Sequence, residues 1–491
     1  MRKASLALFV LTACAALAQA QQSQRSCAVC GSFYPENPAQ LRETMAGFYK
    51  NTASTKKPGG QVVALLAPHA GYYFSGQTAA YAYSAAEDAY DTVVIIGTGH
   101  NARLEKAALN SALYKTPAGD VPTDDAVISG LLRCDGLFEL NPSAHAPEHS
   151  IEVQLPLLLA RLKRPFMLVP VLLNASGLDN AVAAGKAIAA SLRGRKALIV
   201  VSTDLSHYPP ADIARASDLT IIEAVKTLDP YYLALTAKEL EFKKSKNLEV
   251  AVCGLQALLA GISAATALGA NEADLLAYAN AGEMPGFPPD RAVGYAAMAF
   301  VKAAKPQGKN AQLSPEQQKL LLKEARRSIA EGFANTPLSP SPLSAAPELN
   351  LPAALFVTIT ENDRLRGCIG TTEPLGATLD SVRYYARMAA FNDPRFPPLK
   401  EPELNNVKLE ISILSRPELI SSPSSITPGK HGVIVQRASR KGVFLPQVWK
   451  DLPSKEQFLN ELCEQKAGME RDCWKSGNTK LYIFTDYAFS E

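Results

Sequence analysis

The sequence predicts an α/β domain followed by a smaller α+β domain. The chain has 491 residues and 47% hydrophobic content, which exceeds one ordinary core and indicates two or three domains. From about residue 61, apolar runs alternate with helix-like stretches, a pattern that favours a mainly parallel sheet covered by helices. After about residue 350, the strand candidates alternate in polarity, as half-buried strands do.

Four apolar runs are the strand candidates of the first domain: QVVALLAPHA, DTVVIIGTGH, PFMLVPVLL and KALIVVSTDLSH. The segments between them are rich in Ala and Leu, and amphipathic helices are expected at 151–163 and 181–192. The stretch AVGYAAMAFVKAA, near residue 300, is either a further buried strand or a short helix.

The second domain follows a polar stretch, which indicates a linker at 304–313. Ser314 is a good N-cap before Pro315, so an amphipathic helix is expected to begin there. The Pro- and Ser-rich segment 335–349 is expected to form a loop. The strand candidates after it are LFVTITENDRLRGCIG, VKLEISILS and KLYIFTDYAF, which make this unit α+β.

The first 20 residues have the layout of a secretory signal peptide. Two basic residues precede an apolar run, and Ala18-Gln19-Ala20 supplies a small-x-small cleavage site. Cys14 allows a lipoprotein alternative, but the apolar run continues past it, which favours ordinary cleavage. The mature protein is therefore expected outside the cytosol, in a bacterial periplasm or the extracellular space.

Charge and hydropathy argue against two classes of partner. The net charge is only +3, with 50 basic and 47 acidic residues, so nothing points to nucleic acid or a membrane surface. After the N-terminus, no apolar stretch is long enough to span a bilayer.

The chain has eight cysteines, and removal of Cys14 leaves seven, so at least one is unpaired. Cys27 and Cys30 form a C-x-x-C motif, for which a disulfide is the favoured interpretation and a redox or metal motif the alternative. Cys463 and Cys473 are a second plausible disulfide pair.

Titratable side chains follow three of the predicted strands. His69 and His100 each come just after an apolar run, and Asp204 and His207 follow a third. The carboxyl ends of parallel strands share one edge of a sheet, and ligands of open α/β sheets bind beyond that edge. These four residues are therefore expected to line one site.

Imidazoles from separate strands suit a transition metal such as iron, copper, zinc or nickel. From the residues alone, the third ligand stays open between Glu148, Asp204, another imidazole and the thiol of Cys253. The segment EHSIE places His149 between two glutamates, Glu148 and Glu152, which can orient a ligand ring through its free N–H.

Several motifs in order resemble the Memo family over residues 26–303. They are CGSFYP (30–35), APHAGY (67–72), the strand-turn-histidine at 97–100, EHSIEVQLP (148–156), STDLSH (202–207) and VCG (252–254). The resemblance implies a fold similar to class III extradiol dioxygenases, which use non-haem iron(II).

The resemblance also implies roles for particular residues. The metal ligands fall on His69, His100 and Cys253. The thiolate makes copper, and to a lesser degree zinc, competitive with iron(II). The acid/base candidates are Asp204, His207 and His149, and the candidates for supporting the ligands are Glu148 and His145.

The second unit, 314–491, resembles the AMMECR-type domain. The motifs are LRGCIGT (365–371), AFNDPRFPPL (390–399), LEISILS (409–415) and HGVIV (431–435). The pairing matches the AmmeMemoRadiSam systems and so implies a radical-SAM protein as partner. Candidate site residues are Arg366, Cys368, Asp393, Arg395 and His431, although the glycines of the first motif alternatively serve only a tight turn.

The sequence thus predicts a metal-dependent oxidoreductase with an unknown small-molecule or peptide ligand. One alternative is a non-catalytic metal- or peptide-binding protein that works with the radical-SAM partner. A second alternative is a metal-dependent hydrolase with a metal-bound water as nucleophile.

Overall fold

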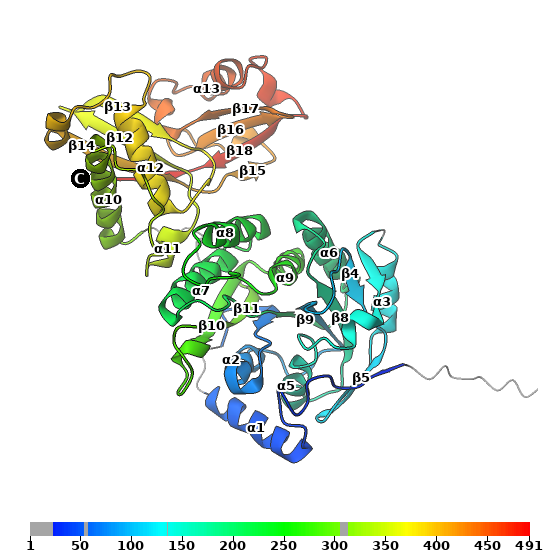
Figure 1. The fold of residues 1–491 in the computed structure, drawn as a ribbon. Coiled ribbons are helices and arrows are strands. Elements are labelled where there is room, and N and C mark those ends of the chain that lie inside the picture. The colour runs from blue at the N-terminus through cyan, green and yellow to red at the C-terminus, as the bar shows by residue number, and fades with distance from the viewer. Residues whose placement is uncertain (1–22, 54–56, 135, 305–312) are drawn as a thin grey trace, which may run out of the picture.

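A computed structural model describes residues 23–53, 57–134, 136–304 and 313–491 (Figure 1). The predicted signal peptide, including Cys14, lies outside the described residues, as does the predicted linker except for its two end residues. Among the residues that are described, no helix combines the length and apolar character needed to cross a bilayer.

The first domain is built on an eight-stranded sheet with the order β10-β11-β2-β9-β3-β8-β4-β7. The central strands β2, β9, β3 and β8 are parallel. Strand β11 is antiparallel to both of its neighbours, and β4 is antiparallel to β8 but parallel to β7. Four of the seven strand pairs of this sheet are parallel, which agrees with the predicted mainly parallel sheet, and 294–302 is a strand rather than a short helix. The strands are β2 (Gln61–Ala67), β3 (Thr92–Thr98), β4 (Ala107–Leu109), β7 (Phe138–Leu140), β8 (Met167–Leu173), β9 (Ala197–Ser202), β10 (Glu272–Asn280) and β11 (Gly294–Lys302).

Helices cover both faces of this sheet, because alternate residues of the buried strands enter two separate cores. Leu65 packs with residues of α1, α2 and α5, and Leu66 packs on the opposite face with residues of α3, α6, α7, α8 and α9. The helices are α1 (Pro38–Asn51), α2 (Tyr72–Ser84), α3 (Asp125–Leu132), α4 (Pro142–His145), α5 (Gln154–Arg161), α6 (Leu178–Ser191), α7 (Ala211–Lys226), α8 (Pro230–Phe242) and α9 (Leu255–Ala267).

One predicted helix begins later than expected. The helix predicted at 151–163 is α5, which starts at Gln154, and residues 151–153 form a turn. Pro156 accounts for the difference, since proline has no N–H to bond to the carbonyl of residue 152 and its ring crowds that carbonyl. The 148–153 segment is therefore irregular, which matters for the site.

A small sheet ties the N-terminal segment to the first domain. Strand β1 (Gln24–Arg25) pairs in parallel with β5 (Leu113–Thr116), and β5 pairs with β6 (Gly119–Val121). Disulfides join Cys27 to Cys30 and, in the second domain, Cys463 to Cys473, which confirms both expected pairs. The other described cysteines, Cys134, Cys253 and Cys368, are free.

The second domain contains two four-stranded sheets, with the orders β13-β12-β14-β19 and β15-β18-β16-β17. Ser314 caps α10 in a capping box with Gln317, which confirms the predicted helix start. Helices α10 and α12 pack on the first sheet, and α13 packs on the second. The elements are α10 (Pro315–Phe333), α11 (Pro347–Asn350), β12 (Leu355–Glu361), β13 (Arg364–Gly370), α12 (Thr378–Phe391), β14 (Val407–Leu414), β15 (Glu418–Ile420), β16 (Gly432–Arg437), β17 (Arg440–Phe444), α13 (Lys455–Glu461), β18 (Lys480–Phe484) and β19 (Asp486–Ser490).

Candidate metal centre

Three side chains that can bind a metal converge beyond the carboxyl ends of the central strands. His69 follows β2, His100 follows β3, and Cys253 stands in the turn before α9. The Nε2 atom of His100 lies 3.3 Å from the Sγ atom of Cys253, and the Nε2 atom of His69 lies 3.7 Å from it. All three donor atoms fall within 4.8 Å of one another. Strands β2 and β3 both flank β9 in parallel, which brings their ends to one place.

Glu148 fixes the orientation and the tautomer of the His100 ring. Its Oε1 atom lies 2.9 Å from Nδ1 of His100, and its Oε2 atom accepts the backbone N–H of His100 at 2.6 Å. Burial alone raises the pKa of Glu148, but the hydrogen bonds from His100 and Ser150 outweigh it and lower that pKa to about 2. An ionised carboxylate only accepts, so Nδ1 donates and the Nε2 lone pair faces Cys253.

Ser202 and Gln154 orient the His69 ring in the same way. The Ser202 hydroxyl donates to the carbonyl of Ser150 at 2.5 Å and accepts from Nε2 of Gln154 at 2.8 Å. The Nδ1 atom of His69, 3.3 Å from this hydroxyl oxygen, therefore acts as a donor. The Nε2 lone pair of His69 is left facing Cys253, like that of His100.

The spacing of the three donor atoms fits a tetrahedral metal. With metal–nitrogen bonds of about 2.0–2.1 Å and a metal–sulfur bond of about 2.3 Å, a tetrahedral angle separates nitrogen from sulfur by roughly 3.5 Å. The observed separations of 3.3 and 3.7 Å lie on either side of that value. The single thiol proton can form a hydrogen bond with only one of the two imidazole lone pairs. A cation can bind both imidazole nitrogens and the sulfur at once.

Burial keeps His69 and Cys253 neutral when no cation is present. It lowers the pKa of His69 to about 3, with a further contribution from His100. Burial, together with the charges of Asp204 and Glu148, raises the pKa of the Cys253 thiol. A metal must therefore displace the thiol proton, so metal affinity is expected to increase with pH.

Asp204 and His207 are held by different partners. Asp204 accepts the backbone N–H of His69 at 2.7 Å, and its Oδ2 atom lies 4.0 Å from Nε2 of His69. Burial raises the pKa of Asp204. His207 is held by backbone bridges to Val250 and Val293, and its buried Nε2 atom has no hydrogen-bond partner among the described residues. Asp204 thus borders the cluster through its contacts with His69.

The remaining two histidines of this domain are placed differently. The ring of His149 stacks on that of His100 with centroids 4.4 Å apart, and its Nδ1 atom lies 3.4 Å from Glu148 Oε1. His145 does not support a ligand ring: its Nδ1 atom faces the Tyr114 hydroxyl and its Nε2 atom faces the Ala108 carbonyl, both at 2.9 Å. The prediction that His145 supports a metal ligand is therefore wrong, and His145 instead binds Tyr114 and strand β4.

Ser202, Gln154 and Arg25 support the site, but the sequence pattern does not predict their roles. The available signals were weak: Ser202 is the last residue of an apolar strand, and Gln154 is the polar start of an apolar helix. The sequence predicts that Glu152, like Glu148, can orient a ligand ring. Because the segment is not helical, Glu152 points instead to Arg25 and the N-terminal turn.

In the second domain, three of the five candidates come together. Asp393 accepts the backbone N–H of Cys368 at 2.8 Å and forms an ion pair with Arg395, which also donates to the Cys368 carbonyl. Arg366 instead pairs with Glu403 at 2.9 Å. His431 lies at the start of the other sheet, where its ring accepts the N–H of Thr427, so it does not join the group.

Comparison with known protein families covers both domains. Residues 25–299, more than half of the chain, match the family described as "Memo-like protein". Residues 322–489 match the family described as "AMMECR1". These matches agree with the resemblance found in the sequence motifs.

Two MEMO1 family proteins match just over half of this chain over nearly their whole length, and one solved structure matches about a third of it. A MEMO1 family protein of Methanopyrus kandleri is 35% identical over 288 residues, covering 56% of this chain and 99% of the relative. One from Methanosarcina barkeri is 32% identical over 276 residues, covering 56% and 98%. A crystal structure from Pyrococcus horikoshii is 36% identical and covers 36% of this chain and 92% of that chain, with a TM-score of 0.33.

Proposed function

This chain belongs to the Memo family and carries an AMMECR1 domain after its Memo-like domain, and from that premise we propose that it binds iron(II) or copper between His69, His100 and Cys253. One observation carries the proposal: two imidazole lone pairs and one thiol sulfur meet within 4.8 Å. The two rings are held with their Nδ1 atoms as donors, which is the usual arrangement for metal-binding histidines.

The proposed activity is metal-dependent oxidation, in line with the family's resemblance to class III extradiol dioxygenases. A redox-active metal supplies electron transfer and open positions for substrate. Asp204 borders the cluster, with Oδ2 4.0 Å from Nε2 of His69. Because burial raises the pKa of Asp204, its carboxylate is the proposed acceptor of a substrate proton. The stacked ring of His149 is partly exposed beside His100, so it lies where an incoming substrate meets the site.

The donor set also favours a second candidate, a non-catalytic copper-binding protein. Thiolate and imidazole ligands hold copper(I) firmly, and His69 is only 2% exposed. In this alternative, the AMMECR1 domain and a radical-SAM partner use the bound metal without turnover at the site.

The test is the metal content of the full chain, purified without added chelator and compared with His69→Ala and Cys253→Ala. We expect about one equivalent of iron or copper in the wild-type protein and a loss of at least tenfold in either variant. Matched controls are His431→Ala and Cys134→Ala, which remove the same residue types elsewhere and are expected to retain the metal.

Oxygen uptake then separates the two candidates. Metal-loaded protein that consumes oxygen with a catechol or thiol substrate, in a manner abolished by His69→Ala, supports the oxidoreductase. Retention of metal without uptake supports the binding protein. Equal metal content in the wild-type protein and both site variants contradicts the proposed site.

A further inference from the structure

The disulfide between Cys27 and Cys30 closes a short N-terminal turn, residues 27–30, called here the cystine turn. Both cysteines are partly exposed, whereas Cys463 and Cys473 of the other disulfide are fully buried. A disulfide that closes so short a loop restrains the unfolded chain less than one that closes a long loop. The effect of this bond is therefore expected to be local, on whatever the turn contacts.

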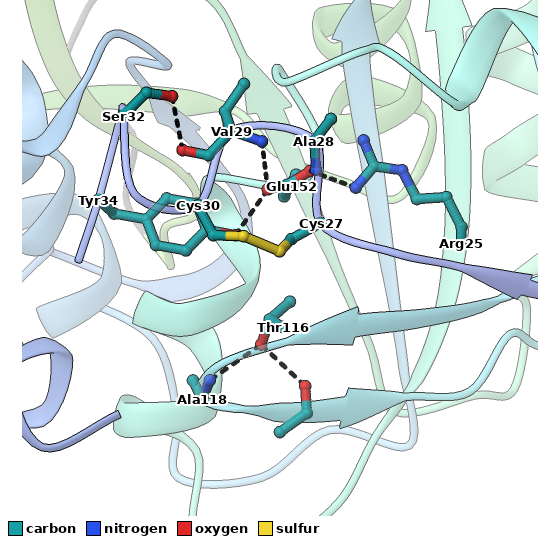
Figure 2. The surroundings of a disulfide bond; sticks show 11 residues. Arg25, Cys27, Ala28, Val29, Cys30, Ser32, Tyr34, Thr116, Ala118 and Glu152 are labelled. Carbon is teal, nitrogen blue, oxygen red and sulfur yellow. Dashed lines mark hydrogen bonds and ion pairs between the residues drawn. A yellow bond between two sulfur atoms is a disulfide. The ribbon is translucent and has the colours of Figure 1, made fainter. Parts of the chain in front are cut away.

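The two residues inside the cystine turn both donate to Glu152. The backbone N–H of Ala28 lies 2.7 Å from Glu152 Oε2, and that of Val29 lies 3.1 Å from Oε1 (Figure 2). The Tyr34 hydroxyl also donates to Oε1, at 2.6 Å. Glu152 is fully buried, so these donors replace the water that its carboxylate lost on folding.

Arg25, just before the turn, extends this attachment to the segment 145–152, called here the anchored segment. Its guanidinium forms an ion pair with Glu152 and donates to the carbonyl of Glu148 at 2.6 Å and of His145 at 3.1 Å. Arg25 is 5% exposed, so these charge-assisted bonds are shielded from water. The N-terminal segment thus holds both ends of the anchored segment.

The anchored segment in turn holds the metal centre. Its Glu148 orients the His100 ring, and its His149 stacks on that ring. Phe33, three residues after the cystine turn, packs on His149 with centroids 4.9 Å apart, and its carbonyl accepts the N–H of Tyr72. Contacts therefore run without interruption from the disulfide to His100.

We propose that Cys27 and Cys30 are a site of thiol–disulfide exchange with a dithiol reductant, and that their reduction loosens the anchored segment and weakens metal binding. The consequence for the metal rests on the function proposed above. Without the disulfide, the turn no longer fixes the N–H groups of Ala28 and Val29 towards Glu152, and Glu148 loses part of its support.

The exchange follows ordinary thiol chemistry. A thiolate of the reductant attacks one sulfur of the pair, breaks the S–S bond and forms a mixed disulfide. The reductant's second thiol displaces that sulfur, so the reductant leaves as its own disulfide and the protein gains two electrons and two protons as two thiols. Attack requires access to a sulfur, which favours the partly exposed pair over the buried Cys463–Cys473 pair.

The test compares the full chain before and after treatment with dithiothreitol, removed under nitrogen before measurement. Thiol labelling with peptide mapping is expected to show Cys27 and Cys30 free and Cys463 and Cys473 still joined. Amide hydrogen exchange at His100 and Ser150, whose N–H groups bind Glu148, is expected to become faster, with Ile95 of β3 unchanged. Affinity for Co²⁺ is expected to fall about tenfold.

Two variants make the result specific. Cys27→Ser/Cys30→Ser is expected to show fast exchange and weak Co²⁺ binding whether or not reductant is added. The matched control, Cys463→Ser/Cys473→Ser, is expected to respond to the reductant like the wild-type protein.

The outcomes separate this inference from the proposed function. Unchanged exchange at His100 and Ser150 after the Cys27–Cys30 bond is reduced overturns the inference, with or without a metal. Oxidised protein that binds no Co²⁺ contradicts the proposed function alone, because the exchange measurement requires no metal.

Discussion

Asp218 carries a buried carboxyl group whose pKa is set by its surroundings. Asp218 is fully buried, and it accepts the N–H of Ser206 at 2.9 Å and the hydroxyl of Tyr278 at 2.8 Å. Burial raises the pKa of Asp218 to about 7. Ser206 adjoins His207, so this carboxyl group supports the turn that carries two of the acid/base candidates.

The raised pKa predicts how stability depends on pH at this residue. Between about pH 4 and pH 7, the unfolded chain releases the Asp218 proton while the folded chain retains it, so the free energy of unfolding decreases as pH rises. We expect this contribution to fall by roughly 2–4 kcal/mol over that range and to stay constant above pH 7.

Asp218→Asn removes the titrating group and keeps an oxygen that can accept from Ser206. Urea unfolding of the first-domain transition from about pH 4 to pH 8 should therefore show a flatter pH profile in the variant than in the wild-type protein. Parallel profiles for the two proteins would mean that Asp218 ionises normally in the folded chain.

Among the elements, the carboxyl ends of the strands were predictable and the connections between them were not. A polar residue after an apolar run placed His69, His100 and Asp204 correctly at strand ends, because a chain leaving a buried strand emerges at the sheet edge. The pairing of Gln154 with Ser202 joins residues 48 positions apart, and no local pattern encodes such a bond.

The irregular 148–153 segment was the element that the sequence pattern described least well. Its apolar spacing resembles that of a helix, but Pro156 prevents the helix from extending upstream. The sequence predicts a mainly parallel sheet but does not identify its antiparallel pairs, which are those of β11 and that of β4 with β8, because these strands are as apolar as the parallel strands. Apolar runs indicate burial on both faces but not strand direction.

The 148–153 segment contributes the Glu148 carboxylate to the site, and the substitution Glu148→Gln tests the role of this carboxylate. An amide NH₂ in place of one oxygen faces an N–H of His100, which turns an attraction into a repulsion. We expect metal affinity to fall about 10–100-fold, measured by competition with a chromophoric chelator. Glu105→Gln, at a side chain that is 80% exposed, is the matched control and should bind metal normally.

At the scale of the whole molecule, the two domains are joined by polar contacts and by Leu343 and Leu351, which pack against the core of the first domain. Lys243, at the end of α8, donates to Asp380 of α12 at 2.6 Å, and its side chain is only 4% exposed. Asn350 donates to Thr220 at 3.1 Å, and Arg416 pairs with Asp229 at 3.0 Å. A cleft of about 1100 Å³, lined in part by Asp229, lies between the domains beside these contacts.

Lys243→Ala is expected to loosen the interface without affecting the metal. The change leaves Asp380 without its main cation, which costs about 1–3 kcal/mol of interface stability. Limited proteolysis should then cleave between the domains faster than in the wild-type protein or in the control Lys238→Ala, an exposed residue of the same helix. Equal cleavage rates would show that the other contacts suffice to hold the domains together.

X-ray absorption at the edge of the bound metal identifies the atoms that bind it. We expect one sulfur and two imidazole nitrogens around the metal in the full chain, with the sulfur lost in Cys253→Ser and retained in Cys134→Ser. A wild-type spectrum without sulfur, or a sulfur that persists in Cys253→Ser, would contradict the assignment of His69, His100 and Cys253 as the metal site.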